Sequence, residues 1–112
     1  MKLIVAIIKP FKLDAVREAL ADIGVNGITV SEVKGFGRQR GHSENHRGKD
    51  DSPELLPKLK LEVAVRHEAL DAALAVIIKA ANSGRIGDGK LFVVNLEKVL
   101  RVRTGESGPE AI

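Results

Sequence analysis

Hydrophobic and polar positions along the first third of the chain follow two different periods, and each period predicts its own kind of element. Residues 3–9 form a run that is mostly apolar and β-branched, which predicts a buried strand ending before Pro10. Apolar residues then recur at helical spacing over residues 13–23, so we predict an amphipathic helix that Gly24 stops. The apolar positions of residues 28–33 predict a second strand.

The second half of the chain shows the same order of elements, without a convincing sequence repeat. Alternation over residues 58–65 predicts a strand with one face inward, and helical spacing over residues 70–81 predicts a second helix. Residues 91–96 predict a further strand, and residues 99–103 a short edge strand. This order predicts a single α+β domain over residues 1–112 with the ferredoxin-like βαββαβ arrangement.

Periodicity is lost between the second and third predicted strands. Residues 35–57 hold several glycines, Pro53 and many charges, with almost no apolar side chain before Leu55. A loop of about 20 residues in a small domain is usually functional or mobile. We therefore expect this loop to take part in the function.

The first predicted strand also bears on assembly. It is apolar at both alternating sets of positions, so both faces of the sheet are expected to be buried. The predicted helices cover one face, and a chain of 112 residues has nothing left to cover the other. Self-association is then the simplest way to bury the second face of the sheet.

Composition excludes several classes of protein. The chain has no cysteine, which excludes disulfides and thiolate chemistry, and its net charge of +3 permits an anionic ligand without demanding nucleic acid. Three phenylalanines are the whole aromatic content, which leaves little for base stacking. No apolar run approaches the roughly 20 residues that span a bilayer, and Lys9 and Pro10 end the first run too early for a secretion signal. We predict a cytoplasmic protein without membrane insertion.

The segment over residues 83–93 carries the strongest chemical signal. Three glycines within residues 84–89 leave backbone N–H groups unshielded, and such a loop can form an anion-binding nest. Residues 84–90 resemble the Walker pattern, but Leu91 replaces the Ser or Thr that would hold magnesium, and the loop opens a strand rather than a helix. A nucleotide site of a different architecture is the preferred interpretation, and a helix stop followed by a simple turn is the alternative.

Two further basic sets favour a polyphosphate ligand. Residues 34–41 are rich in glycine and basic side chains at the exit of the second predicted strand. Arg101 and Arg103 alternate, so on an extended segment both would project from one face and suit bidentate phosphate contacts; a solvated edge is the alternative. The first basic stretch also resembles an RNA-recognition signature, but Arg38 and Gln39 stand where its stacking aromatic and its neighbour belong, which argues against RNA.

Catalytic chemistry has little support in the sequence. His42 and His46, with the nearby Asp50 and Asp51, are either candidate ligands of a transition metal or polar loop residues. The sequence offers no Ser/His/Asp arrangement with recognisable local context and no pair of carboxylates in apolar surroundings. We therefore predict that the protein is not an enzyme.

Several segments, in order, match one known family. They are residues 7–13, 16–20, 33–39 with 41–42, 56–58 with Glu62, 83–93 and 101–106. On these segments the chain resembles the PII signal-transduction proteins, which are trimeric nitrogen and carbon sensors, over nearly its whole length. The resemblance implies a homotrimer with the family's T-loop over residues 37–55 and a phosphate loop over residues 82–90.

The resemblance also implies ligands and the residues that bind them. ATP or ADP would lie in three clefts between subunits, and the implied nucleotide-binding residues are Thr29, Gly35, Gly37, Arg38, Gln39, Glu62, Ala64, Gly87, Asp88, Gly89, Lys90, Arg101 and Arg103. Mg²⁺ would sit on the ATP phosphates with a carbonyl oxygen from Gln39, and 2-oxoglutarate would chelate that ion. The residues implied for 2-oxoglutarate are Lys9, Gln39, Lys58 and Gly87. Such a protein controls a target protein through its T-loop, by differential contact rather than by a chemical step.

The T-loop departs from the family pattern at the positions that many members modify. The signature Tyr-Lys/Arg-Gly-Ala/Ser-Ala/Glu-Tyr falls on residues 46–51, where Asp51 replaces the nucleotidylated tyrosine and Lys49 the serine that other members phosphorylate. The chain has no tyrosine, so neither modification can occur at these positions. We expect a divergent member whose target can be a membrane transporter other than the ammonium transporter. The alternative is a PII-like sensor of a metal ion or bicarbonate, with His42 and His46 as candidate metal ligands.

Overall fold

The computed structural model describes residues 1–36 and 55–112, and within them the elements follow the predicted order. The strands are β1 (Lys2–Ile8), β2 (Thr29–Phe36), β3 (Leu55–Val65) and β4 (Gly89–Asn95), and the α-helices are α1 (Leu13–Asp22) and α2 (Leu70–Ala81). Short 3-10 helices precede the α-helices and lie near the end of the chain: η1 (Pro10–Lys12), η4 (His67–Ala69) and η5 (Gly108–Ala111). The βαββαβ order confirms the ferredoxin-like prediction.

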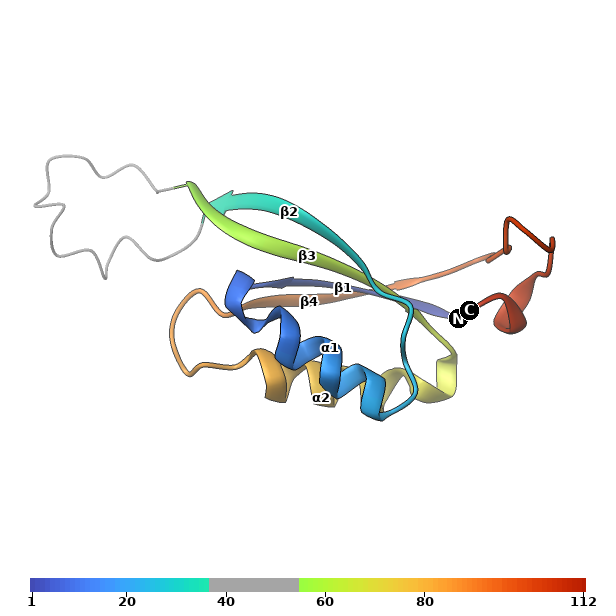
Figure 1. The fold of residues 1–112 in the computed structure, drawn as a ribbon, viewed down its shortest axis with the longest axis horizontal. Coiled ribbons are helices and arrows are strands. Elements are labelled where there is room, and N and C mark those ends of the chain that lie inside the picture. The colour runs from blue at the N-terminus through green and yellow to red at the C-terminus, as the bar shows by residue number, and fades with distance from the viewer. Residues whose placement is uncertain (37–54) are drawn as a thin grey trace, which may run out of the picture.

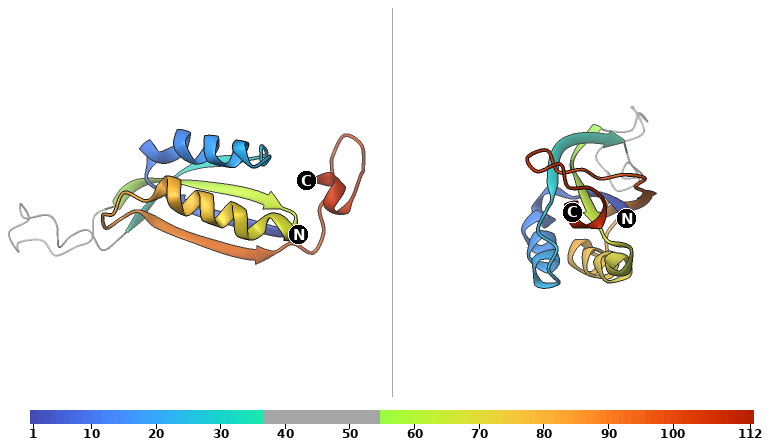
Figure 2. Two further views of the ribbon diagram at one scale, coloured as in Figure 1. Left: turned by 90° about the horizontal axis from the view of Figure 1, so that it is seen from below. Right: turned by 90° about the vertical axis from the view of Figure 1, so that its right-hand side faces the viewer.

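The strands form an antiparallel sheet in the order β2-β3-β1-β4. Figure 1 shows α1 and α2 below this sheet, and Figure 2 shows them side by side along its length. β1 lies between β3 and β4, and Ile8 at its end pairs with both Leu59 and Gly89. The glycine-rich loop (residues 82–90) therefore rejoins the sheet at the point where β1 ends.

The core lies between the sheet and the helices. It is built from side chains at every second position of the central strands and at helical spacing on α1 and α2, namely Ile4, Ala6, Ile8, Val16, Leu20, Leu59, Leu61, Val63, Val65, Ala73, Ile77 and Ala81. Burial of each larger aliphatic side chain stabilises the fold by about 1.5–3 kcal/mol. These positions are those that the two hydrophobic periods mark in the sequence.

The two α-helices end differently. Gly24 follows α1 with a φ of +84°, and its N–H donates to the Ala21 carbonyl at 2.9 Å, so this glycine stops the helix as predicted. α2 ends at Ala81, and Asn82 is already extended with a φ of −74° and a ψ of 124°. The chain therefore passes from α2 directly into the glycine-rich loop.

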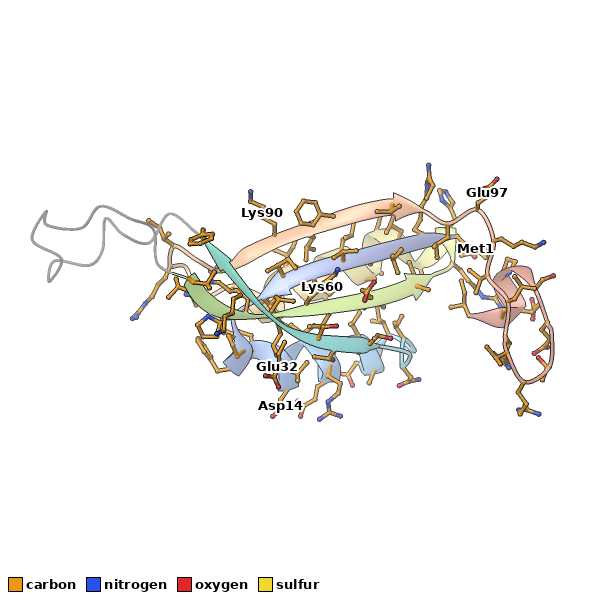
Figure 3. All side chains as sticks on the ribbon, turned by 90° about the horizontal axis from the view of Figure 1, so that it is seen from above. Met1, Asp14, Glu32, Lys60, Lys90 and Glu97 are labelled. Carbon is orange, nitrogen blue, oxygen red and sulfur yellow. The ribbon has the colours of Figure 1, made fainter. Side chains whose placement is uncertain are left out.

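The other side of the sheet, which we call the open face, carries the residues that alternate with the core. Leu3, Val5 and Ile7 of β1 are partly buried there, and their β4 neighbours Phe92 and Val94 are about half exposed, at 50% and 49%. Figure 3 looks onto this face, and no helix of the described residues lies over the strands. The apolar β1 and β4 part of this face is thus left uncovered by residues 1–36 and 55–112, in agreement with the prediction.

The hairpin of β2 and β3 is longer than the sequence predicts. β3 begins at Leu55 rather than at Lys58, and β2 continues to Phe36, which pairs with Leu55. The extra pairs carry exposed or half-exposed side chains, so no burial pattern marks them. β2 and β3 are extended here by backbone pairing with each other, and the sequence of one strand alone does not show where its partner lies.

The short edge strand predicted over residues 99–103 is wrong. The chain there makes only an isolated bridge between Leu100 and Ser107. The Gly105 N–H donates to the Arg101 carbonyl at 2.8 Å, and the Arg101 N–H donates to the Glu106 carbonyl at 2.9 Å. These local hydrogen bonds, with Gly105 at a φ of +75°, close residues 101–106 into a turn. We call residues 101–106 the arginine turn.

Candidate functional site

The glycine-rich loop is held by left-handed backbone turns. Gly84, Gly87 and Gly89 have φ values of +76°, +95° and +106°, a region that residues with a β-carbon rarely adopt. The Asn82 side-chain oxygen accepts the Gly84 N–H at 2.7 Å and fixes the first of these turns. Three residues of this loop thus have the backbone conformation that favours glycine.

Gly89 also makes a close approach that excludes any side chain. A β-carbon on this residue would lie 1.7 Å from the carbonyl oxygen of Ile7 and 2.8 Å from its carbonyl carbon. Both atoms belong to β1, whose pairing with β4 begins at this point. Glycine is therefore needed here for β4 to join the sheet.

The carboxylate of Asp88 organises the loop from within. One oxygen accepts the backbone N–H groups of Ser83 at 2.8 Å and Gly84 at 3.1 Å. The other accepts the Ser83 hydroxyl at 2.5 Å and pairs with the Lys9 ammonium at 3.2 Å. These hydrogen bonds, above all that from the Ser83 hydroxyl, and the Lys9 charge hold the pKa of Asp88 well below its usual value of 3.8. Asp88 is thus an internal anion in the loop.

Two lysines from neighbouring strands meet this loop. Lys9 follows β1 and donates to the Ser83 hydroxyl at 3.2 Å in addition to its ion pair with Asp88. Lys58 of β3 donates to the Gly87 carbonyl at 2.6 Å. Partial burial lowers the pKa of Lys58 below its usual 10.5, the Lys9 charge acts in the same direction, and Asp88 opposes both. The structure therefore brings together Lys9, Lys58 and Gly87, which the sequence analysis assigned to one ligand.

A pocket of about 710 Å³ holds another part of the predicted site. Thr29 on β2, with Glu62 and Ala64 on β3, lines it. Thr29 is paired with Glu62, and all three lie on the open face. Gly35 pairs with Leu56 toward the other end of β2, two positions along β3 from Lys58, which contacts the glycine-rich loop.

Of the two arginines in the arginine turn, only Arg101 makes side-chain contacts with nearby residues. The Arg101 guanidinium pairs with the Glu106 carboxylate at 3.2 Å and donates to the Glu110 carbonyl at 3.4 Å. The Arg103 side chain is exposed, and among the described residues no hydrogen bond or ion pair engages it. The expectation that both guanidinium groups project from one extended face is therefore not met, because the backbone turns between them.

The predicted phosphate groups lie at opposite ends of the molecule. Figure 1 shows the glycine-rich loop (orange) at one end of the sheet and the arginine turn (red) at the other. From Lys90 to the end of β4 at Asn95 the strand advances five residues, about 17 Å, and the arginine turn lies beyond that end. Lys90 and Arg103 of one chain therefore cannot bind the same phosphate.

Several predicted residues lie outside the described part of the chain. They are Gly37, Arg38, Gln39, His42, His46, Lys49, Asp50 and Asp51, together with most of the T-loop. Within residues 1–36 and 55–112, no group of three or more His, Cys, Asp or Glu side chains could hold a metal ion. In the same residues, no helix is both long and apolar enough to cross a membrane.

Sequence reasoning missed the part that Ser83 and Asn82 play in the loop. Both lie at the end of α2 and bond to groups within the next six residues. Asn side chains commonly accept a backbone N–H two residues on, which was the available signal for Asn82, whereas the Ser83 hydroxyl bonds to the Asp88 side chain. Asp88, which the resemblance assigns to the nucleotide, bonds to the loop itself, and its part in nucleotide binding stays a prediction.

Comparison with known proteins identifies the family. The family model described as Nitrogen regulatory protein P-II matches residues 1–106. The chain belongs to this P-II family. The nitrogen regulatory protein P-II of Mesorhizobium japonicum is 57% identical over 112 residues, and the nitrogen regulatory protein GlnK of Escherichia coli is 54% identical over 112 residues. Each alignment covers 100% of both chains.

A solved P-II structure agrees with the fold. Arabidopsis thaliana PII bound to citrate matches with a TM-score of 0.82 at 36% identity, covering 99% of this chain and 91% of that chain. The family assignment by resemblance and the ferredoxin-like fold are thus confirmed. As a member of the P-II family, the chain is a signal-transduction regulator, and its relatives bear the names of regulatory proteins rather than enzymes.

Proposed function

We propose that this P-II chain is a homotrimeric regulator that binds ATP and ADP in clefts between its subunits. The observation that carries the proposal is the separation of the glycine-rich loop from the arginine turn, at opposite ends of β4. Lys90 and Arg103 can act on one polyphosphate only if they come from different subunits. A closed ring of copies supplies that pairing at every seam.

The arrangement of the sheet suits a nucleotide laid along it. Glu62 lines the pocket and lies three residues from Leu59 on β3. Leu59 is level with the glycine-rich loop, because its partner Ile8 also pairs with Gly89. The pocket wall and the loop are therefore about 10 Å apart along the strands. A nucleoside polyphosphate spans this distance with its base near Thr29 and its phosphates at Gly87, Gly89 and Lys90.

The open face supports assembly. Apolar side chains of β1 and β4, including Phe92 and Val94, remain accessible on it in the single chain. Exposed apolar patches of this kind are typical of protein interfaces. Packing of three sheets through their open faces buries these side chains and brings the arginine turn of each subunit to the loop of its neighbour.

We further propose that Mg²⁺ and 2-oxoglutarate join ATP, but not ADP, at the loop. Mg²⁺ would be held by the phosphates with Gln39, which lies outside the described residues, so no protein cluster of acids is required for it. The ion would supply positive charge between the phosphates and the dicarboxylate. Lys58 at the Gly87 carbonyl is the described cation best placed for a carboxylate. Because ADP lacks the third phosphate, effector binding depends on the nucleotide present.

The output of the regulator is assigned to the T-loop. Residues 37–54 join β2 to β3 in the sequence. The pairing of these two strands continues three pairs beyond Lys58. Their charged sequence, with Asp51 in place of the tyrosine, argues for a target other than the usual partners of the family. A sensor of a metal ion or bicarbonate, acting on another transporter, is the second candidate, and the observation that favours it is the pair His42 and His46 in this loop.

Calorimetry and mixed trimers test the proposal together. The parent is titrated with ATP and ADP, with and without Mg²⁺ and 2-oxoglutarate, and with Zn²⁺ or bicarbonate for the second candidate. Lys90→Met and Arg103→Ala variants are each expected to lose nucleotide affinity. Co-expressed with different tags and isolated as mixed trimers, they should regain full-affinity sites in about one third of the clefts, since one of the three seams in each mixed ring joins an intact loop to an intact turn. A monomeric parent, or mixtures without any recovery, would refute a shared site.

A further inference from the structure

Two side chains of opposite charge, Lys60 and Glu62, lie on the open face. Their β3 neighbours Leu59 and Leu61 are buried in the core, and successive residues of a strand alternate between the two sides of a sheet. Figure 3, which looks onto the open face, labels Lys60 on it. Among the described strand residues the only other acid is Glu32, which pairs with Leu59 and so lies on the side of the helices. Glu62 is therefore the one acid that the described strands present on the open face.

Neither charge is paired within the single chain. Among residues 1–36 and 55–112, no hydrogen bond or ion pair engages the side chain of Lys60 or of Glu62. The residues that lie opposite them on the neighbouring strands carry no charge: Ile7, Ser31, Val5 and Thr29. Lys60 and Glu62 themselves are two positions apart on β3, about 7 Å. Both are already partly buried, so each charge has lost some of its water without gaining a partner.

Lys60 differs from the other two lysines of the open face. Lys58 donates to the Gly87 carbonyl at 2.6 Å, and Lys90 is exposed on β4, at the edge of the sheet. Lys60 is partly buried on β3, which lies between β2 and β1. Lys60 is therefore the cation that would lose most of its water if another copy covered this face.

Assembly through the open face would bury both charges with the apolar side chains. Val5 pairs with Glu62 on one side and with Phe92 on the other, so a neighbour that covers these two apolar residues also covers the carboxylate. An unpaired charge is strongly unfavourable away from water, whereas a charge that meets an opposite one is tolerated. The partner must come from another copy, because none lies within reach in the described part of the chain.

A ring of three identical copies supplies that partner without any further component. Every seam of such a ring joins the same two surfaces, so a contact made at one seam is made at all three. The three copies bring three Lys60 and three Glu62 side chains, which leave no charge unpaired if each lysine meets the glutamate of its neighbour. Three lysines gathered without these acids would repel one another.

We propose that each seam of the trimer contains an ion pair between Lys60 of one subunit and Glu62 of the next. The inference rests on the proposed function, since it concerns the same homotrimer. The apolar side chains supply contact area, whereas the ion pairs favour the one arrangement of copies that neutralises both charges. Because Glu62 also lines the pocket of about 710 Å³, the pair links the assembly to the wall of the proposed nucleotide site.

Charge reversal of either residue tests the pair. Lys60→Glu places two acids at each seam and Glu62→Lys places two bases there, so each variant alone should dissociate. The protein concentration at which half of the chains are assembled should rise by at least about 100-fold over that of the parent. Lys79→Glu is the matched control, since it makes the same change of charge at an exposed position of α2 and should assemble like the parent.

Mixing the two reversed variants distinguishes a pair between subunits from a pair within one chain. Where the two variants meet in a ring, positions 60 and 62 of adjacent subunits again carry opposite charges, so two of the three seams in each mixed ring are restored. The mixture should therefore form trimers that contain both chains. Light scattering after size-exclusion chromatography measures this with differently tagged chains, and circular dichroism shows that each variant is folded. If a reversed variant does not fold, Lys60→Met and Glu62→Gln replace the pair: each alone should weaken assembly, and the double variant should recover it.

The possible outcomes separate this inference from the proposed function. Dissociation of both reversed variants with recovery on mixing supports the ion pair. Reversed variants that remain trimeric overturn it, and so do variants that dissociate without recovery on mixing. A Glu62→Lys variant that stays trimeric and loses only ATP affinity also overturns it, because Glu62 would then serve the nucleotide alone. A monomeric parent refutes the proposed trimer and this inference together, whereas a trimeric parent that binds neither ATP nor ADP refutes the nucleotide proposal alone.

Discussion

Gly89→Ala is the substitution for which the structure gives the sharpest expectation. The new β-carbon would lie 1.7 Å from the Ile7 carbonyl oxygen and 3.3 Å from the Ile8 α-carbon. These are backbone atoms of the central strand β1, so they cannot rotate away as a side chain would. β4 must therefore move at its first residue, where Gly89 pairs with Ile8.

The cost of this change can be worked out from its parts. A side chain at a φ of +106° costs about 1–2 kcal/mol by itself. Separation of the first β1–β4 pair loses about 1 kcal/mol for each net hydrogen bond. Together they predict a destabilisation of about 3 kcal/mol, or a fall in Tm of roughly 10 °C for a domain of this size.

Gly24→Ala is the matched control. Gly24 also has a positive φ, of +84°, but a β-carbon there would meet no atom within 4 Å. It should therefore show only the backbone cost of about 1 kcal/mol. Urea unfolding of both variants at one protein concentration, followed by circular dichroism, measures the difference, and the fixed concentration matters because assembly contributes to stability. If Gly89→Ala loses no more stability than Gly24→Ala, the argument from the close approach to β1 is wrong.

Four further outcomes are expected. Ile77→Ala, at a fully buried position of α2, should cost about 2–5 kcal/mol in urea unfolding, whereas Ile78→Ala, which is 57% exposed, should cost far less. Lys90→Met should raise the calorimetric Kd for ATP roughly 10- to 150-fold, because it removes a charge-assisted contact of about 1.5–3 kcal/mol; an unchanged Kd would exclude Lys90 from the site. Because folding lowers the pKa of Asp88 below its usual value of 3.8, the ionised carboxylate stabilises the fold at pH values above 3.8. The difference in unfolding free energy between the parent and Asp88→Asn should therefore shrink as the pH falls below 3.8. Val5→Glu on the open face should yield monomers by light scattering, and a variant that still forms trimers would show that this face is not the interface.

The elements that the sequence predicts correctly are those whose burial is periodic. Ala73, Ile77 and Ala81 recur at helical spacing because α2 presents one face to the sheet, and the predicted and observed helices both span residues 70–81. Gly24 marks the end of α1 because a positive φ was needed there. In both cases a local property of the residue and its place in the fold agree.

The features that escaped prediction depend on partners far away or on local hydrogen bonds. Leu55 joins β3 because Phe36 lies opposite it, and neither side chain is buried. Arg101 and Arg103 have the spacing of a strand, but the bond from the Gly105 N–H to the Arg101 carbonyl turns the chain back. The ion pair of Lys9 and Asp88 joins residues 79 positions apart in the sequence, so only the fold could reveal it.

The hairpin of β2 and β3 continues after β1 has ended, and this gives the chain a lever. Beyond the pair of Val33 and Lys58, three more pairs carry the two-stranded ribbon about 10 Å farther, to Phe36 and Leu55. Paired strands resist bending better than a single strand, so a small rotation at the root of the ribbon becomes a larger displacement at its tip. The root is where Lys58 meets the Gly87 carbonyl. A molecule that displaces this lysine from the Gly87 carbonyl would therefore act at the root of the ribbon, and the pair of Phe36 and Leu55 at its tip would be displaced farthest among the paired residues.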